Sequence, residues 1–600
     1  MLRTRWFDSV DRSCPLAEYP RPQMVRDTWL CLNGPWDYAI TADIKDFPEE
    51  YDGTITVPFA PECELSGVCR KLHPDRRLWY RRSITVPESF RGKRCILHFG
   101  AVDWQCAVFV NGSKAMEHTG GYCPFSADIT DLLRDGENTI VVRVYDPTDA
   151  GWQNRGKQSL ESHGFWYTGT SGIWQTVWME PVSDSHIRSV RMVPDIDAGN
   201  VCLRTDLSGE GEVFACVKAA SDVVFEGVVP TDDAHIPVPN ARLWSPEDPF
   251  LYDLELELRA DGIVVDRVRS YFGMRKFSTG TVNGITRLFL NNKPYFQRGL
   301  LDQGYFPDGG LTPPTDEAMI YDIRKMKELG FNMLRKHIKV DLARWYYHCD
   351  RIGMLVWQDM VSGGKWIGNF YAGVVPNILG ACPRLTPFTV HDNSHYKRFS
   401  REKPEWRAAY ETELREMLDT LMNCVSIYCW VPFNEAWGQF DAVRIAETVK
   451  AYDPSRIVDH ASGWYDQGAG DVMSMHKYIL PIPKIKPDSR AFVISEFGGY
   501  SQVPDGHVWN KSKSFGYLMY RSKRTLTEAY RKLMEKQILP LIPKYLSGFV
   551  YTQVTDVEFE VNGILTYDRE IVKMDEDTLK SLNDKMQYRK ETEYGSFSSL

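Results

Sequence analysis

The spacing of apolar and polar residues divides the chain into three parts. In residues 1–180, short apolar or alternating runs are separated by turns such as Asn111-Gly112. Short strands with such turns are typical of an all-β sandwich. Residues 181–276 form a smaller unit of the same character, with strand-like runs at Val201–Asp206, Gly211–Val217 and Leu251–Leu258. This spacing fits an immunoglobulin-like β-sandwich.

Between residues 277 and 600, strand patterns alternate with helix patterns. The first strand is predicted at Tyr295–Leu301, and the next helix should follow the capping residue Thr315 and end at Gly330. A second helix is predicted after the capping residue Asp341, with Gly353 at its end. The remaining strands and one amphipathic helix are predicted at Phe331–His337, Met354–Met360, the apolar start of Cys424–Gln439, Ile457–His460, Val472–Tyr478, Ala491–Phe497 and Gly548–Val554, with the helix at Trp406–Met422. Eight strands in this pattern indicate a C-terminal (β/α)8 TIM barrel, and Ser362–Arg401 is expected to form a loop over its site.

Composition and charge exclude several classes of protein. Hydrophobic residues make up 43% and charged residues 25% of the chain, as in ordinary globular proteins. A net charge of -9 without a long basic block argues against a nucleic-acid partner. No uninterrupted apolar segment is long enough to span a membrane and no secretory signal is visible, so a cytoplasmic protein is expected. The 13 cysteines are scattered and include no CxxC pair, which favours reduced thiols over disulfides or a zinc site.

Two glutamates stand where barrel proteins place their chemistry. Glu435 follows the apolar run in CVSIYCWVPFNEAWGQ, and Glu496 follows the one in AFVISEFGG. At the ends of strands four and seven, their side chains would face each other across the barrel mouth. A single strand-end glutamate is more often a solvated or structural group, but glycoside hydrolysis requires a facing pair. One carboxyl protonates the leaving oxygen and the other attacks the anomeric carbon, with retention of configuration at a separation of about 5–5.5 Å.

The two carboxyl groups need different surroundings. The acid must keep its proton near neutral pH, which apolar neighbours such as Trp430, Phe433 and Trp437 would favour. The nucleophile must stay ionised, and Arg335 or Tyr478 could donate hydrogen bonds to it.

Several motifs resemble those of glycoside hydrolase family 2. WVPFNEAWGQ is similar to the acid/base motif of that family, and VISEFGG is similar to its nucleophile motif. YPRPQMVRDTWLCLNGPWDYAI, TSGIWQTVWME, YFGMRKF and LGFNMLRKH resemble further family segments, in the family's order. The resemblance covers almost the whole chain. It implies a jelly-roll sugar-binding domain at 1–180, an immunoglobulin-like domain at 181–276 and a catalytic barrel at 277–600.

The resemblance also implies roles for single residues. Glu435 would be the acid/base, Glu496 the nucleophile, and Asn434 a ligand of the sugar 2-hydroxyl. Arg335 would hold the nucleophile side, and Tyr478 would donate a hydrogen bond to the nucleophile. Further substrate-binding residues at strand ends would be His337, Asp359, Trp464 and His476. No cofactor is expected, and no ligand cluster in the sequence assigns a metal.

Two departures from the family pattern affect the prediction of which sugar the substrate carries. β-Glucuronidases of the family carry an Asn-x-Lys motif that binds the uronate carboxylate, where this chain has EFEVNGILTYDR. Glu558 and Glu560 would repel a carboxylate, which favours a terminal neutral sugar in a β-galactoside-like substrate. However, LLDQGYFPDGG stands where many β-galactosidases have a His-rich stretch. A β-glucuronide, β-mannoside or arabinopyranoside as substrate, a carbohydrate-binding protein without activity, and assembly into a homo-oligomer all stay open.

Overall fold

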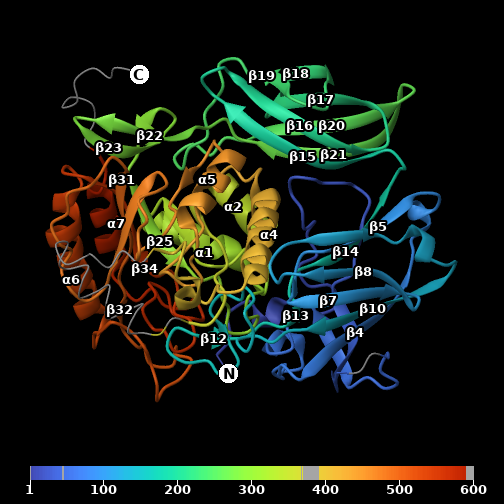
Figure 1. The fold of residues 1–600 in the computed structure, drawn as a ribbon, viewed down its shortest axis with the longest axis horizontal. Helices are drawn as coiled ribbons and strands as arrows, with labels where there is room; N and C mark the ends of the chain where they lie inside the picture. Colours follow the sequence, from blue (N-terminus) through green and yellow to red (C-terminus); the bar gives the residue numbers. More distant parts are fainter. Residues whose placement is uncertain (1, 44–45, 367, 369–390, 589–600) are drawn as a thin grey trace.

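The computed structural model describes residues 2–43, 46–366, 368 and 391–588. Two β-sandwiches and a barrel follow one another along the chain, and each contacts the other two (Figure 1). This architecture confirms the predicted fold class of jelly roll, immunoglobulin-like sandwich and TIM barrel. Most of the expected loop Ser362–Arg401 lies outside the described residues.

The first sandwich is built from two antiparallel sheets that share one apolar core. The sheets have the strand orders β1-β14-β5-β9 and β3-β2-β4-β10-β7-β8, and Trp36, Leu97 and Val142 are among the core residues between them. The strands are β1 (Leu30–Cys31), β2 (Gly34–Ala42), β3 (Gly53–Val57), β4 (Arg76–Thr85), β5 (Arg94–Phe99), β6 (Val102–Asp103), β7 (Gln105–Val110), β8 (Ser113–Thr119), β9 (Phe125–Asp128), β10 (Glu137–Tyr145), β11 (Gln158–Ser159), β12 (Tyr167–Thr168), β13 (Gly172–Ile173) and β14 (Val177–Val182). The short strands β11 and β12 pair with each other in the long connection after β10.

The second sandwich packs the sheet β15-β16-β19 against the sheet β18-β17-β20-β21. Alternate residues of β20, such as Leu254, Leu256 and Leu258, point into its core, as the period of a half-buried strand requires. The strands are β15 (His186–Asp195), β16 (Asn200–Ser208), β17 (Glu212–Ala219), β18 (Asp222–Val229), β19 (Ala234–Pro237), β20 (Tyr252–Ala260) and β21 (Ile263–Phe272). The immunoglobulin-like architecture predicted from the sequence is therefore present.

The barrel is an eight-stranded parallel sheet in the described chain, with the order β29-β28-β27-β26-β25-β34-β31-β30. Strands such as β27 and β28 are buried on both faces, because helices cover the outside and side chains fill the inside. The strands are β25 (Gln297–Asp302), β26 (Met333–Lys336), β27 (Leu355–Asp359), β28 (Ile427–Val431), β29 (Ile457–Val458), β30 (Val472–Lys477), β31 (Ala491–Gly498) and β34 (Leu546–Thr552). The helices are α1 (Asp316–Glu328), α2 (Ala343–Ile352), α4 (Pro404–Leu421), α5 (Ala442–Tyr452), α6 (Lys523–Leu533) and α7 (Glu576–Lys585).

An antiparallel sheet of β22 (Phe277–Val282), β23 (Ile285–Leu290) and β24 (Lys293–Pro294) covers the amino-terminal end of the barrel. The first barrel strand was predicted at Tyr295–Leu301, but its first two residues lie between this sheet and the barrel strand. The Tyr295 amide donates to Leu288 and so continues the hairpin, and the barrel strand begins only at Gln297. With one end of the barrel covered, the site lies at the other, carboxyl end.

The two predicted helix caps had different outcomes. Thr315 caps α1, since its side chain accepts a hydrogen bond from the Ala318 amide. The prediction for Asp341 was wrong, because α2 begins at Ala343 and has no side-chain cap. The Asp341 carboxylate instead accepts a hydrogen bond from the buried ammonium of Lys336 at 2.6 Å.

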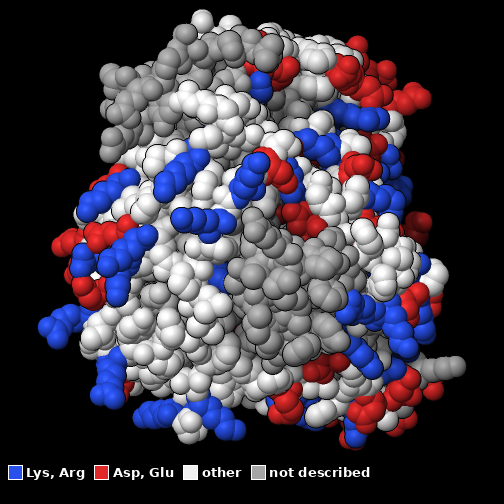
Figure 2. Space-filling view, turned by 60° about the vertical axis from the view of Figure 1, so that its left-hand side comes forward, with Lys and Arg blue, Asp and Glu red and all other residues white. Residues whose placement is uncertain are grey.

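Surface charge, helix hydropathy and cysteines can be described directly for the folded chain. On the face shown in Figure 2, basic and acidic side chains are interspersed. None of the helices in residues 2–43, 46–366, 368 and 391–588 is both long and apolar enough to cross a membrane. Every cysteine in these ranges is a free thiol.

Candidate active site

A pocket lies at the carboxyl ends of the barrel strands. Five of the residues predicted for the site line it, namely His337, Asn434, Glu435, Tyr478 and Glu496. A larger cavity of about 220 Å³ lies elsewhere, between residues 16–24 and the start of α2, and neither glutamate lines it. The pocket at the strand ends is therefore where the chemistry can take place.

Glu496 lies near the end of β31 and is 3% exposed. Arg335 donates to its Oε1 at 3.1 Å, and the Tyr478 hydroxyl donates to its Oε2. One of these donors is a permanent cation, and hydrogen bonds to a carboxylate favour its charged form. Two hydrogen-bond donors, one of them cationic, therefore hold the Glu496 carboxyl group in place.

Glu435 lies in the loop after β28, where it and Ala436 adopt the left-handed backbone conformation with φ of 50° and 60°. Its side chain is 23% exposed, and Trp437 lines the pocket beside it. Burial raises the pKa of Glu435 to about 7, although the positive charge of Lys157 opposes the rise. Glu435 can therefore hold a proton close to neutral pH, as a general acid must.

The two carboxyl groups approach each other closely. An oxygen of Glu435 lies within 4.8 Å of an oxygen of Glu496. Between them, Nδ1 of His476 is 2.9 Å from Glu435, and its Nε2 is 3.5 Å from Glu496. Burial lowers the pKa of His476 to about 4, so the imidazole is neutral at pH 7. The separation is short for a water molecule between acid and base, and it fits direct attack by one carboxylate.

A buried network supports this pair. The Arg335 guanidinium donates to Asp359 and to Asn434, each at 2.8 Å, in addition to Glu496. The second oxygen of Asp359 is 2.8 Å from Nδ1 of His337. Arg335 and Asp359 are fully buried and lie behind the pocket wall. Their geometry is suited to orienting Glu496 and Asn434.

The three aromatic residues expected around Glu435 lie in different parts of the structure. Trp437 lines the pocket, whereas Trp430 donates to Asp453 and Phe433 stacks on Tyr410 in the barrel core. Only one of the three expected aromatic neighbours therefore contacts the pocket in the described structure. Trp464 packs edge-on against His476 with ring centroids 5.4 Å apart, outside the pocket lining.

Sequence reasoning missed several pocket residues. Lys157, Phe165 and Trp166 come from the first sandwich, in the connection between β10 and β13, and Tyr517 stacks on Tyr478 from a barrel loop. Glu560, noted in the sequence only for its charge, also lines the pocket. The one available signal for the sandwich residues is the length and aromatic content of GKQSLESHGFWYTG, which exceed what a strand connection needs.

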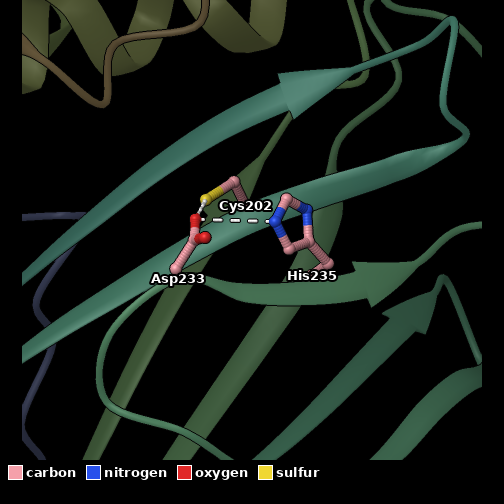
Figure 3. A group of neighbouring side chains, drawn as sticks. All are labelled: Cys202, Asp233 and His235. Carbon is pink, nitrogen blue, oxygen red and sulfur yellow. Dashed lines mark hydrogen bonds and ion pairs between the residues drawn. The ribbon is translucent and has the colours of Figure 1, made fainter.

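Two groups of side chains in the described residues have spacing that could suit a metal ion. The first is Glu435, His476 and Glu496, where an ion would occupy both carboxylates that hydrolysis requires. The second is Cys202, Asp233 and His235 on the immunoglobulin-like domain (Figure 3). The thiol lies 3.2 Å and the imidazole 3.5 Å from the same, largely exposed carboxylate, as in a hydrogen-bonded surface group.

Family models match most of this architecture. The model described as "Glycosyl hydrolases family 2, sugar binding domain" matches residues 73–181, "Glycosyl hydrolases family 2" matches 185–275, and "Glycosyl hydrolases family 2, TIM barrel domain" matches 283–485. The three matches follow the order of the domains and together cover about two thirds of the chain.

Individual proteins resemble the chain over long stretches. A β-galactosidase of Thermoanaerobacter pseudethanolicus is 30% identical over 80% of this chain and 62% of its own length, and one of Clostridium acetobutylicum is 24% identical over 81% and 52%. This chain thus spans about half to three fifths of these relatives. Two similar solved structures share the fold. One is a β-D-glucuronidase of Dictyoglomus thermophilum, with a TM-score of 0.73 and 16% identity over 95% of this chain and 98% of that one. The other is a β-galacturonidase of Eisenbergiella tayi, with a TM-score of 0.69 and 17% identity over 94% of this chain and 99% of that one. On the strength of three successive family models over a matching three-domain structure, the chain belongs to glycoside hydrolase family 2.

Proposed function

We propose that this protein is a retaining, exo-acting β-glycosidase in which Glu435 is the acid/base and Glu496 the nucleophile. One observation carries the proposal. Two carboxyl oxygens lie within 4.8 Å of each other in one pocket, where burial raises the pKa of Glu435 to about 7 and a guanidinium donates to Glu496. Such a pair, one protonated and one ionised, is the requirement for double displacement.

In the first step a Glu496 oxygen forms a bond to the anomeric carbon. The bond from that carbon to the leaving oxygen breaks, and the leaving oxygen takes the proton of Glu435. Arg335 and Tyr478, which both donate to Glu496, hold the attacking carboxylate in place. The product of this step is a glycosyl ester of Glu496 and a free aglycone.

In the second step Glu435, now ionised, takes a proton from a water molecule. The water oxygen attacks the anomeric carbon, and the ester bond to Glu496 breaks with its electron pair returning to the carboxylate. Asn434, fixed by Arg335 at 2.8 Å, is the proposed partner of the sugar 2-hydroxyl. Both glutamates end in their starting states.

The proposed substrate carries a terminal neutral sugar and is β-galactoside-like. The buried carboxylate of Glu560 in the pocket disfavours an anionic sugar. The relatives from Thermoanaerobacter pseudethanolicus and Clostridium acetobutylicum carry the name β-galactosidase, which is in line with this choice.

A β-uronide is the second candidate substrate, and Lys157 is the observation that favours it. The ammonium group of Lys157 lines the pocket and could pair with a sugar carboxylate. The similar solved structures named β-glucuronidase and β-galacturonidase agree with this alternative.

The proposal is tested by turnover of nitrophenyl β-galactoside, β-glucuronide, β-mannoside, β-glucoside and α-L-arabinopyranoside, with Glu496→Gln as the control. We expect the β-galactoside to be hydrolysed, the variant to be inactive, and proton NMR to show the β-anomer as the first product. A first-formed α-anomer would refute retention. Equal turnover by Glu496→Gln would refute the assignment of the nucleophile.

A further inference from the structure

Lys157 belongs to the first sandwich, yet it lines the pocket of the barrel. It lies next to β11, and its Nζ is 5.6 Å from the ring centroid of Tyr167 and 5.8 Å from that of Phe165. In the described part of the chain, the contacts of this ammonium group are the rings of Tyr167 and Phe165, and no ion pair includes it. A cation between two aromatic rings at the edge of a substrate pocket is free to bind a ligand.

Glu560 presents the opposite charge to the same pocket. It is 2% exposed, and no cationic group within the described residues forms an ion pair with it. Its Oε2 accepts a hydrogen bond from the Tyr167 hydroxyl, and its Oε1 accepts one from the Asn562 amide at 2.9 Å. Since each carboxylate oxygen has two acceptor sites, both can take a further donor.

Tyr167 links the two charges. Its ring lies below the Lys157 ammonium, and its hydroxyl donates to Glu560. The Thr168 amide, one residue further along, donates to Glu558 at 2.9 Å and fixes the same segment to the barrel loop. In Figure 1 the segment that carries β12 leaves the blue and cyan sandwich and lies beside the barrel loops. Lys157 and Glu560 therefore lie on one wall of the pocket, at a contact between two domains.

We infer that Lys157 and Glu560 bind neighbouring hydroxyl groups of the terminal sugar and together select a neutral sugar. The ammonium group would donate to one hydroxyl oxygen, and the carboxylate would accept from the next hydroxyl. This inference rests on the proposed function and names the residues that decide its substrate class.

Opposite charges on one wall disfavour charged sugars of both signs. A uronate attracted by Lys157 meets the carboxylate of Glu560, and an amino sugar attracted by Glu560 meets the ammonium of Lys157. A pair of hydroxyl groups satisfies both side chains without burying a further charge. Because Lys157 comes from the first sandwich, that domain completes the site.

The test compares Lys157→Met and Glu560→Gln with the wild type on nitrophenyl β-galactoside and β-galacturonide. Lys157→Met should lower kcat/KM for the β-galactoside roughly tenfold to a hundredfold, mostly through KM, because a charge-assisted hydrogen bond to substrate is lost. Glu560→Gln should raise the ratio of β-galacturonide to β-galactoside turnover at least about tenfold, because a repulsive charge is removed.

Two matched variants serve as controls. Glu117→Gln neutralises an exposed carboxylate, and Lys114→Met removes the exposed lysine paired with it; neither residue lines the pocket. Both should keep the wild-type sugar ratio. The thermal midpoint of each variant shows whether it is folded.

Calorimetry of galactose and galacturonate binding separates this inference from the proposed function. If no glycoside is hydrolysed, the proposed function fails, but weaker galactose binding by Lys157→Met would still support the contact. Unchanged binding and an unchanged sugar ratio in both variants would overturn the inference. Preference of the wild type for galacturonate would also overturn it.

Discussion

Protonation of Glu435 should set the alkaline limit of activity. Burial raises the pKa of Glu435 to about 7. Only the protonated carboxyl can supply the leaving oxygen with a proton, so kcat should fall as the pH rises through this value.

In Glu435→Gln, hydrolysis of substrates with poor leaving groups should fall by roughly 10²–10⁴-fold. Nitrophenyl glycosides need little protonation and should lose much less in their first step.

The measurement is a pH–rate profile of wild type and Glu435→Gln on an alkyl glycoside and a nitrophenyl glycoside of the same sugar. The variant should no longer show the alkaline limb on the activated substrate. Equal losses on both substrates would contradict the role of Glu435 as the acid.

At the scale of single elements, α1 provides a local test of sequence-based reasoning. Thr315 caps this helix by accepting from the Ala318 amide, in line with the prediction from sequence. Thr315→Ala should lower the free energy of unfolding by about 1 kcal/mol, because the Ala318 amide loses its side-chain acceptor and keeps only the Thr315 carbonyl. Denaturant unfolding of both proteins measures this difference, and kcat should not change.

Thr412→Ala is the matched control for Thr315. Thr412 is an exposed residue within α4, where its hydroxyl donates to the Ala408 carbonyl. Alanine has the higher helix propensity, so this variant should keep or slightly gain stability. A loss at Thr412 as large as that at Thr315 would argue against capping as the cause.

At the scale of the whole molecule, Arg26 joins the two sandwiches. Its guanidinium lies 3.1 Å from Glu180 in β14 and 2.7 Å from Asp266 in β21, and its side chain is 7% exposed. Arg26→Met would leave buried carboxylates without this partner. We expect the free energy of unfolding at pH 7 to fall by about 3–5 kcal/mol.

The effect of Arg26→Met should depend on pH. Burial opposes ionisation of Glu180, but the charges of Arg21 and Arg26 lower its pKa to about 2. A pKa below the ordinary 4.5 gives stability that is present above pH 4.5 and is lost as the pH falls toward 2. The difference between the two proteins should therefore be largest at neutral pH and shrink in acid.

Urea unfolding at pH 7 and pH 3 measures this difference, with Arg188→Met as the control. Arg188 pairs with Asp206 on the surface, where both side chains are more than half exposed. Such a pair contributes about 0–1 kcal/mol, so the control should change little. Equal small effects of the two variants would show that Arg26 does not join the domains.

Much of the fold could be predicted because residues close together in the sequence determine its helices, strands and turns. The alternation of short strands, the strand–helix repeats of the C-terminal half, and the end caps at Thr315 and Gly353 are all set by neighbouring residues. The failures occur where a distant partner competes with a local preference. Asp341 could cap a helix, but the buried ammonium of Lys336 needs a counter-ion more strongly.

The features of the candidate site also differ in whether local sequence could predict them. The two glutamates could be found from the sequence alone, because an apolar run followed by a carboxylate is visible within about ten residues. The burial of Glu435 and the presence of Lys157, Phe165 and Trp166 in the pocket follow from the folded arrangement of the domains. Burial and the docking of one domain on another depend on contacts between residues hundreds of positions apart, such as Tyr167 with Glu560, and no local pattern encodes them.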